Sequence, residues 1–244
     1  AKNMGDPDFV PFDTPSFLSE TRIEQIISDY DPQKTHPAVH YGEKKSVGTD
    51  SGTSHLSVLD SAGNAISLTT TINTGFGSEV ITDMGIVLNN QMDDFVARPG
   101  VPNFFGLVGT RANAIAPGKR PLSSMSPTIL RRKNKAMVVV GASGGPTIIT
   151  STVQTILNLL RFDLNPKAAV NLSRVHHQWQ PNLIYIEPSM RESRRLALRK
   201  KGHKLEVRER FSAVQVISTL NGIAEGAADP SKGGAAYATV DPSP

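Results

Sequence analysis

The pattern of apolar and polar residues changes near residue 52. Before that point Pro, Gly and Asp interrupt the pattern, and only the segment 15–30 contains a predicted helix, with Ser19 as its N-cap. The apolar face of that helix is formed by Ile23, Ile26 and Ile27. Residues 31–52 contain Pro, Gly, Ser and Lys without any period, which predicts a flexible linker.

From Thr53 onward the pattern is typical of regular structure. Two β-rich runs, residues 54–60 and 65–72, flank the turn signal "SAGN" and predict a β-hairpin. Further strands are expected at 85–90, at the end of 113–130, and at 136–143, 203–209, 213–222 and 223–229. The run at 136–143 is continuously apolar, so we expect that strand to be buried.

Two helices are expected among these strands. The first follows "GASGG", has Pro146 in its first turn, and shows an apolar stripe that we expect to face the core: Ile149, Val153, Ile156 and Leu160. The second covers residues 191–201 and ends at Gly202. Runs of strands with a few helices predict an α/β (α+β) protein in which helices pack on antiparallel sheet.

Composition narrows the class of protein. The chain has 244 residues, of which 38% are hydrophobic and 20% charged, ordinary values for a globular protein. The formal net charge of +4 is too small to predict a dedicated nucleic-acid binder. The sequence contains no run of about 18 apolar residues, so it predicts no membrane span. Because cysteine is absent, disulfides, zinc thiolates and a thiol nucleophile are excluded.

The first candidate for chemistry is the Gly52-Thr53 step. A threonine hydroxyl is a weak nucleophile unless a base lies beside it. If the peptide bond before Thr53 is cut, the new α-amino group becomes that base, because its pKa is roughly 8. Glycine at position 52 leaves the carbonyl sterically open. Taken alone, Thr53 is better explained as the first residue of a strand, where threonine is favoured.

Two further motifs are candidate binding sites. Gly144 and Gly145 end a strand before a helix, where bare backbone N–H groups bind an anion or an oxyanion, although a tight turn explains them as well. Acceptors in "NNQMDDF" suit an ammonium group and hydroxyls in "PLSSMSP" suit a carboxylate, so together they fit an amino-acid head group. Each motif alone is also explained as a capped turn.

Six sequence blocks, in their order and spacing, resemble the γ-glutamyltranspeptidase family. They are Gly-Thr-Ser-His at 52–55, "TTTINTGFGS" at 69–78, "GIVLNNQMDDF" at 85–95, "KRPLSSMSPTI" at 119–129, "GASGG" at 141–145 and "RVHHQW" at 174–179. The resemblance implies an N-terminal nucleophile hydrolase with a four-layer αββα sandwich, made as a zymogen and cut autocatalytically between Gly52 and Thr53.

The resemblance also implies a role for each matched residue. Thr53 matches the nucleophile, Thr71 the threonine that hydrogen-bonds it, and Gly144 and Gly145 the oxyanion pair. The substrate α-amino group would be held by Asn73, Gln91 and Asp94, and the α-carboxylate by Ser123 and Ser124. The implied reaction moves a γ-glutamyl group from glutathione or a related amide to water or an amino acid, with no cofactor and no metal.

The same resemblance divides the chain. Residues 1–52 match the tail of the large subunit up to the cleavage site, and residues 53–244 match the small-subunit catalytic region. The large subunit would be the partner in a heterodimer, and in the family it supplies an arginine for the substrate α-carboxylate. Arg22 is the one arginine in residues 1–52 and no motif gives it that role. Phe105 stands where bacterial members often have a lid tyrosine.

Two other functions remain open from the sequence. One is a cephalosporin or glutaryl-amide acylase, which has the same fold and nucleophile. The other is an uncleaved fragment that binds amino acids without catalysis. Bacterial members of the family are mostly periplasmic or secreted, so we expect that location here.

Overall fold

The computed structural model describes residues 4–41, 52–101, 103, 105, 107, 109–179, 181–209 and 212–239. The helices are α1 (Thr14–Phe17), α2 (Glu20–Ser28), α3 (Ala38–Tyr41), α4 (Thr147–Leu160), α5 (Pro166–Asn171) and α6 (Glu192–Lys200). The strands are β1 (Thr53–Leu59), β2 (Ala65–Thr71), β3 (Thr128–Arg132), β4 (Lys135–Ser143), β5 (Val175–His176), β6 (Ile184–Ile186), β7 (Leu205–Val207), β8 (Ala213–Ser218) and β9 (Glu225–Ala228). Short 3₁₀ turns form at Gln91–Asp94, Arg111–Asn113 and Pro230–Lys232.

The central sheet is antiparallel, with strand order β3-β4-β8-β9. β4 is buried from Val138 to Ser143, as its continuous apolar run predicts. Because neighbouring side chains on a strand point to opposite faces, Val138 and Val140 pack against α4 and α5. Burying valine, isoleucine and leucine on this face is the largest source of stability in the described chain.

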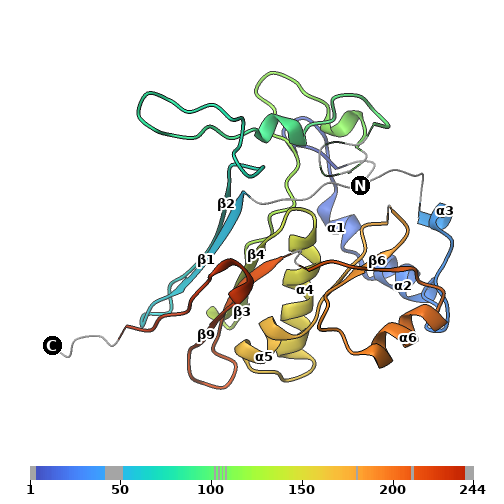
Figure 1. Cartoon of the computed structure of the whole chain (residues 1–244), viewed down its shortest axis with the longest axis vertical. Coiled ribbons are helices and arrows are strands. Elements are labelled where there is room, and N and C mark those ends of the chain that lie inside the picture. The colour runs from blue at the N-terminus through green and yellow to red at the C-terminus, as the bar shows by residue number, and fades with distance from the viewer. Residues whose placement is uncertain are drawn as a thin grey trace.

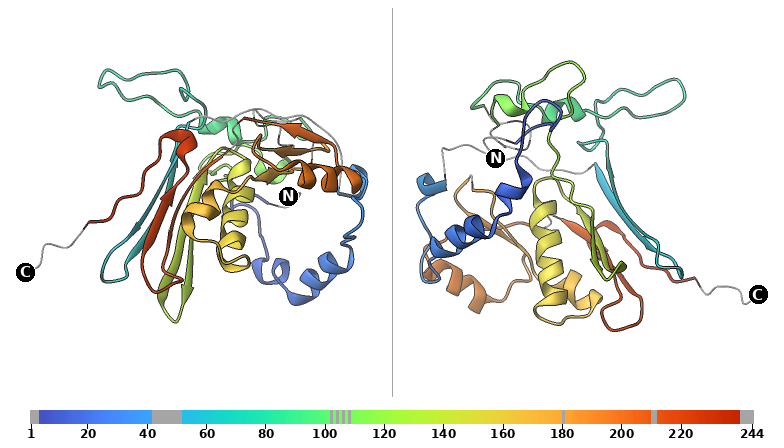
Figure 2. Two further views of the ribbon diagram at one scale, coloured as in Figure 1. Left: turned by 60° about the horizontal axis from the view of Figure 1, so that its bottom comes forward. Right: turned by 180° about the vertical axis from the view of Figure 1, so that it is seen from behind.

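The hairpin β1-β2 packs on the other face of the central sheet (Figures 1 and 2), so α4 and α5, the sheet and the hairpin form three successive layers. The face of the hairpin that meets the sheet is polar. Ser67 Oγ donates to the Val140 carbonyl at 3.1 Å and accepts from the Thr128 N–H at 3.0 Å. His55 bonds Thr69 and Ser57 and lies directly under Gly141, where a Cβ would come within 2.2 Å of the ring.

The outer face of the hairpin is apolar and exposed. Its four large side chains, Leu56, Val58, Ile66 and Leu68, are between 39% and 56% exposed. In the part of the chain that the structure describes, no helix packs on this face. Three layers of an αββα sandwich are therefore present among these residues, and the fourth is not.

A second, three-stranded sheet of β5, β6 and β7 lies beside α4 and carries α6. Its junction with the central sheet holds a buried arginine. Arg174 pairs with Glu187 and with Asp229, both at 2.7 Å, and all three side chains are nearly inaccessible to water. Removing one partner of such a group leaves a buried charge unpaired, which typically costs about 3–5 kcal/mol.

The N-terminal segment lies against this scaffold at two places. The backbone N–H and the guanidinium of Arg120 bond the carboxylate of Asp6 and hold its pKa well below the usual range. Farther along, the Thr35 N–H donates to the Lys201 carbonyl at the end of α6 at 2.8 Å. α2 begins at the expected cap, because Ser19 Oγ accepts from the Arg22 N–H.

Most expected elements are confirmed, and three expectations are wrong. Residues 85–90 form a single bridge, Val87 with Ile81, in place of a strand. The expected core stripe of α4 is misplaced, since Ile149, Val153 and Leu160 are about half exposed. The helix instead turns Ile148, Thr152, Thr155 and Leu159 inward, because small hydroxyl side chains allow close approach to the sheet.

The third correction concerns the expected linker at 31–52. Its described part contains the helix α3, and residues 42–51 lie outside the described residues. The mixed helix and antiparallel sheet of the α+β class is confirmed. Among the described residues, none of the helices combines the length and hydropathy that a bilayer crossing requires.

The buried His55 predicts a pH-dependent stability. Burial lowers the pKa of His55 from 6.5 to about 4, so the unfolded chain binds a proton at pH 5 that the folded chain excludes. Stability should therefore be complete above pH 6.5 and fall as the pH drops toward 4. The loss should be about 1–2 kcal/mol, less than the full pKa shift gives, because water reaches part of the ring.

Urea unfolding of the wild type and of His55→Gln between pH 4 and 7 measures this contribution. The variant should show a smaller fall in the free energy of unfolding over that range. His203→Gln is the comparison variant: burial also lowers the pKa of His203, but its ring is more exposed, so this change should reduce the fall by less than His55→Gln does. Identical pH profiles for the wild type and His55→Gln would contradict the prediction.

Candidate functional site

The register of the hairpin places two threonine hydroxyls together. Thr53, the first residue of β1, pairs with Thr71, the last residue of β2. Their Oγ1 atoms are 3.0 Å apart, and the Asn73 N–H donates to Thr71 Oγ1 at 2.8 Å. Thr53 is only 5% exposed, so its hydroxyl is held in one position beneath the surface.

The two threonines lie at a pocket of about 460 Å³. Eight of the ten residues predicted from the sequence line it: Thr53, Thr71, Asn73, Gln91, Asp94, Ser123, Ser124 and Gly145. The other two, Gly144 and Gly52, are not lining residues, but each directly precedes one in the sequence, Gly145 and Thr53. Segments from the hairpin, the 3₁₀ turn at Gln91–Asp94, the loop before β3 and the start of α4 thus meet at one place.

One wall of the pocket gathers hydrogen-bond acceptors. Asn73 Nδ2 lies 3.4 Å from Asp94 Oδ1, and Gln91 Nε2 bonds Asp94 Oδ2. Asn73 adopts a left-handed backbone, with φ of 78°, which asparagine tolerates better than most residues. A carboxylate with two amides around it is suited to bind an ammonium group, as expected from the motif.

Ser123 and Ser124 lie across the pocket on the loop before β3. The Met125 N–H donates to Ser123 Oγ at 3.1 Å, which fixes the rotamer of that serine. The Leu122 N–H is held by Asn113 Oδ1 at 3.0 Å, and Asn113 Nδ2 donates to the Asp94 carbonyl at 2.8 Å. Asn113 therefore links the acceptor wall to the serine wall, a role that no sequence motif indicated.

Gly144 and Gly145 form the turn from β4 into α4, with φ of 135° and 57°. Residues with a side chain rarely adopt these backbone conformations, so glycine is required at this turn. Gly145 lines the pocket at the N-terminal end of α4. The partial positive charge of a helix N-terminus favours an anion at this position. The geometry of the turn therefore suits the oxyanion role, which stays a prediction.

The loop around Phe105 covers part of the pocket. Phe105 is 5% exposed and lines the pocket together with Asn103 and Leu107. The Phe105 and Leu107 N–H groups both donate to Asn103 Oδ1, which folds this loop on itself. The pocket lining is thus apolar at Phe105.

Lys232, a polar residue near Thr53, was not found from the sequence, whereas His176 belongs to the block "RVHHQW". Lys232 Nζ donates to the Thr53 carbonyl at 3.2 Å, from the 3₁₀ turn that Asp229 caps. His176 lines the pocket but bonds Thr150 and Gln178, and burial lowers its pKa, so it remains neutral. A lysine 179 positions away in sequence gives no local signal of its neighbour.

The basic side chains among the described lining residues are His176 and His177, with no arginine or lysine. Arg22, the single arginine of residues 1–52, lies on α2 over the ring of Phe17 and is not a lining residue. Among the described residues, the side of the pocket at Ser123 and Ser124, where a substrate carboxylate is predicted, therefore has no lysine or arginine.

Gly52 is tightly packed against backbone. A Cβ at this position would come within 2.3 Å of the Thr74 carbonyl oxygen and 2.9 Å of the Asn73 carbonyl oxygen. The Gly52 carbonyl accepts from the Ile72 N–H at 3.4 Å. The chain can therefore reach Thr53 along this path only with glycine at position 52.

Comparison with known families decides the relationship. The model of the γ-glutamyltranspeptidase family matches residues 1–239. The chain belongs to this family. The glutathione hydrolase proenzyme of Escherichia coli strain K12 is 41% identical over 230 residues, which are 93% of this chain and 40% of that protein. An Arabidopsis thaliana protein with the name "Putative inactive glutathione hydrolase 4" is 41% identical over 189 residues, which are 76% of this chain and 99% of that protein.

Solved structures agree with the assignment to the γ-glutamyltranspeptidase family. A mutant of Helicobacter pylori γ-glutamyltranspeptidase is 43% identical, covers 72% of this chain and 98% of its own, and superposes with a TM-score of 0.70. A cephalosporin acylase from Bacillus halodurans superposes over 94% of this chain at a TM-score of 0.75 and 23% identity, which shows a shared fold alone. The N-terminal nucleophile hydrolase fold is thereby confirmed. This member of the family spans about 40% of the length of the E. coli proenzyme that it matches.

The packing of Gly52 predicts that Gly52→Ala destabilises the protein. The added methyl group meets backbone oxygens, so the chain before β1 must shift, which should cost about 1–3 kcal/mol. Urea unfolding measures the change. Ser54→Ala is the matched control, because Ser54 is exposed and already carries a Cβ. Equal stability of Gly52→Ala and the wild type would show that this backbone is free to move.

Proposed function

We propose that this chain carries the nucleophile of a γ-glutamyltransferase and glutathione hydrolase, with Thr53 as the attacking residue. The observation that carries the proposal is the 3.0 Å contact between the Thr53 and Thr71 hydroxyls at a pocket lined by Asp94, Asn73 and Gln91. Family membership supports it. The glutathione hydrolase names belong to relatives of which this chain spans less than half.

The first step proposed is cleavage between Gly52 and Thr53. Thr53 Oγ1 adds to the Gly52 carbonyl carbon, the C–N bond breaks, and the chain before it becomes an ester on Thr53. Water hydrolyses that ester, which leaves a Gly52 carboxylate and a free Thr53 amine. The Ile72 N–H, which donates to the Gly52 carbonyl, would stabilise negative charge on that oxygen.

The second step proposed is acyl transfer. The free Thr53 amine takes the proton of its own hydroxyl, and Oγ1 attacks the γ-carbonyl of the substrate. Thr71 orients the hydroxyl, and the turn at Gly144 and Gly145 receives the oxyanion. The amide C–N bond of the substrate then breaks, the leaving amine takes the proton held by the Thr53 amine, and a γ-glutamyl ester remains on Oγ1. Water or an amino-acid amine attacks that ester, restores the Thr53 hydroxyl and releases glutamate or a γ-glutamyl product. Holding both charges of the glutamyl head would fix the γ-carbonyl against Thr53.

The partner proposed is a large-subunit polypeptide. Two apolar faces of the described chain remain exposed, the outer face of the hairpin and the stripe of Ile149, Val153, Leu157 and Leu160 on α4. Faces of this kind mark sites of protein association. The αββα sandwich needs a helical layer on the hairpin, and the pocket needs a cation at its carboxylate end. A large subunit would supply both.

A periplasmic or secreted location is also proposed. It is supported by the resemblance to bacterial members of the family. Fractionation of the native host, with the chain detected by antibody, would test it.

Thr53→Ala should abolish both cleavage and turnover. Removing the hydroxyl removes the nucleophile of both steps, so kcat/KM on a γ-glutamyl anilide should fall by about a thousandfold or more. The measurements are the intact mass under denaturing conditions, after incubation at neutral pH, and anilide hydrolysis by the chain co-expressed with a large subunit. Thr53→Ser should keep part of both activities, and Thr21→Ala, exposed on α2 and away from the pocket, should keep all of them.

Persistent turnover by Thr53→Ala would exclude Thr53 as the nucleophile. If the wild-type chain alone gives a single uncut mass, and gives two species once the large subunit is present, then cleavage takes place only in the complex with the large subunit. An uncut wild type in both preparations would instead support the amino-acid-binding alternative. The Arabidopsis relative whose name includes the word inactive also favours the absence of catalysis.

Asp94 distinguishes the transferase from an acylase of the same fold. A glutaryl group has no α-amine, so an acylase gains nothing from the carboxylate of Asp94. In the transferase, Asp94→Asn should lower kcat/KM for γ-glutamyl anilide by about 10- to 100-fold, the range expected for a lost charge-assisted hydrogen bond. Glutaryl anilide should be a poor substrate for both proteins. Equal wild-type rates on the two anilides would favour the acylase.

A further inference from the structure

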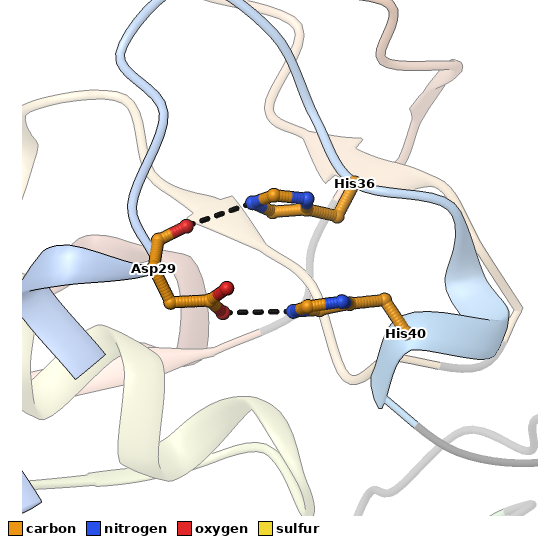
Figure 3. A group of neighbouring side chains, drawn as sticks. All are labelled: Asp29, His36 and His40. Atoms are coloured by element: carbon orange, nitrogen blue, oxygen red, sulfur yellow. Dashed lines mark hydrogen bonds and ion pairs between the residues drawn. The ribbon is translucent and has the colours of Figure 1, made fainter. Parts of the chain in front are cut away.

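Three side chains suited to bind a metal converge at the end of α2, away from the pocket. Asp29 is the C-cap residue of α2, His36 lies in the loop that follows, and His40 lies in α3 (Figure 3). No other group of three such side chains is this close together in the part of the chain that the structure describes. None of the three lines the pocket at Thr53.

The two rings approach the same residue from parallel planes. His40 Nε2 lies 2.7 Å from Asp29 Oδ2, and His36 Nε2 lies 2.8 Å from the Asp29 carbonyl oxygen. The ring centroids are 4.3 Å apart with an angle of 15° between the planes. Figure 3 shows one nitrogen of each ring directed at Asp29. The candidate ligand atoms all lie within 4.8 Å of one another.

The scaffold around this group is fixed at both ends. Asp29 is held by the last turn of α2, where its N–H donates to the Gln25 carbonyl. Thr35, the neighbour of His36, donates its N–H to the Lys201 carbonyl at 2.8 Å, and its methyl group packs near Gly202. The loop therefore connects α2 to the end of α6. The rings of His36 and His40 stack on one side of this segment.

Helix capping explains part of this arrangement. The His36 ring caps a carbonyl at the C-terminal end of α2, and His40 lowers the pKa of Asp29 through its hydrogen bond. Either ring alone would serve that purpose. Capping gives no reason for a second, stacked imidazole to direct its nitrogen at the same residue.

We propose that Asp29, His36 and His40 bind one divalent transition-metal ion, for which Zn²⁺ is the natural probe. Imidazole nitrogen and carboxylate oxygen are both zinc ligands, with bonds of about 2.0–2.2 Å. Each Nε2 now donates a hydrogen to Asp29, so binding requires that each ring carry its proton on Nδ1 instead. Small rotations of these three side chains would bring the ligand atoms to the roughly 3.3 Å spacing of a tetrahedral site, with water in the fourth position.

Such an ion would link the end of α2 to α3 through its bonds to Asp29, His36 and His40. The segment carrying it precedes β1, whose first residue is Thr53. The role assigned is structural: a metal that fixes the C-terminal end of α2, independent of the acyl-transfer chemistry proposed above. Its presence or absence is tested by binding and does not depend on catalysis.

The test is titration of the purified chain, freed of any histidine tag, with ZnCl₂ in a calorimeter. The wild type should bind one equivalent of Zn²⁺. His36→Gln, His40→Gln and Asp29→Asn should each weaken binding by about tenfold or more, as expected when a metal site loses a ligand or its support. Glutamine retains an N–H group able to cap the Asp29 carbonyl, so a loss in His36→Gln reports the metal and not the cap. His203→Gln, outside the group, should bind like the wild type.

Far-UV circular dichroism of each variant shows whether it is folded. If a variant unfolds, the absorption spectrum of the Co²⁺-loaded wild type replaces it, and intense tetrahedral bands are expected. Wild-type binding no tighter than that of the His36→Gln/His40→Gln double variant would overturn the proposal and leave helix capping as the whole role of the group. Loss of binding in His203→Gln alone, or six-coordinate Co²⁺ with no protein ligand, would overturn it as well.

Discussion

The site depends on a single constraint, the register in which β1 pairs with β2. That register sets Thr53 opposite Thr71 and brings their hydroxyls within 3.0 Å. Because side chains alternate along a strand, a slip of one residue would move Thr53 to the other face of the hairpin. The Asn73 N–H on Thr71 and the Lys232 amine on the Thr53 carbonyl hold the two ends of this pair.

The register also explains why the interior between the two sheets is polar. The inner face of the hairpin carries His55, Ser57, Ser67 and Thr69, and these groups bond one another or the backbone of the central sheet. Gly141 gives His55 the space that a side chain would occupy. The apolar residues of the same strands face outward as a consequence. The face that supports the site and the face left for a partner are therefore two sides of one alternating pattern.

Much of the site was predictable because its chemistry lies in short, ordered motifs. Gly-Thr at 52–53, the double glycine at 144–145 and the double serine at 123–124 each have few alternative explanations once all occur together. Residues such as Asn113 and Lys232 were not predictable, since a single polar residue acquires its role only from a neighbour far away in sequence. The grouping of His36 and His40 with Asp29 was not predictable for another reason: the path of the loop after α2 brings the three side chains together, and no sequence motif indicates that path.

The sequence by itself determined most of the strands, the hairpin, the family resemblance and the candidate site residues, because these follow from local periodicity and from motif spacing. Only the tertiary structure decided which face of α4 is buried. Its Ile149 stripe has the stronger apolar pattern, yet Thr152 and Thr155 face the sheet, since close packing depends on the shape of the opposing surface. The segment at 85–90 has strand-forming residues but no neighbouring strand beyond one bridge, and a strand exists only where a partner accepts its hydrogen bonds.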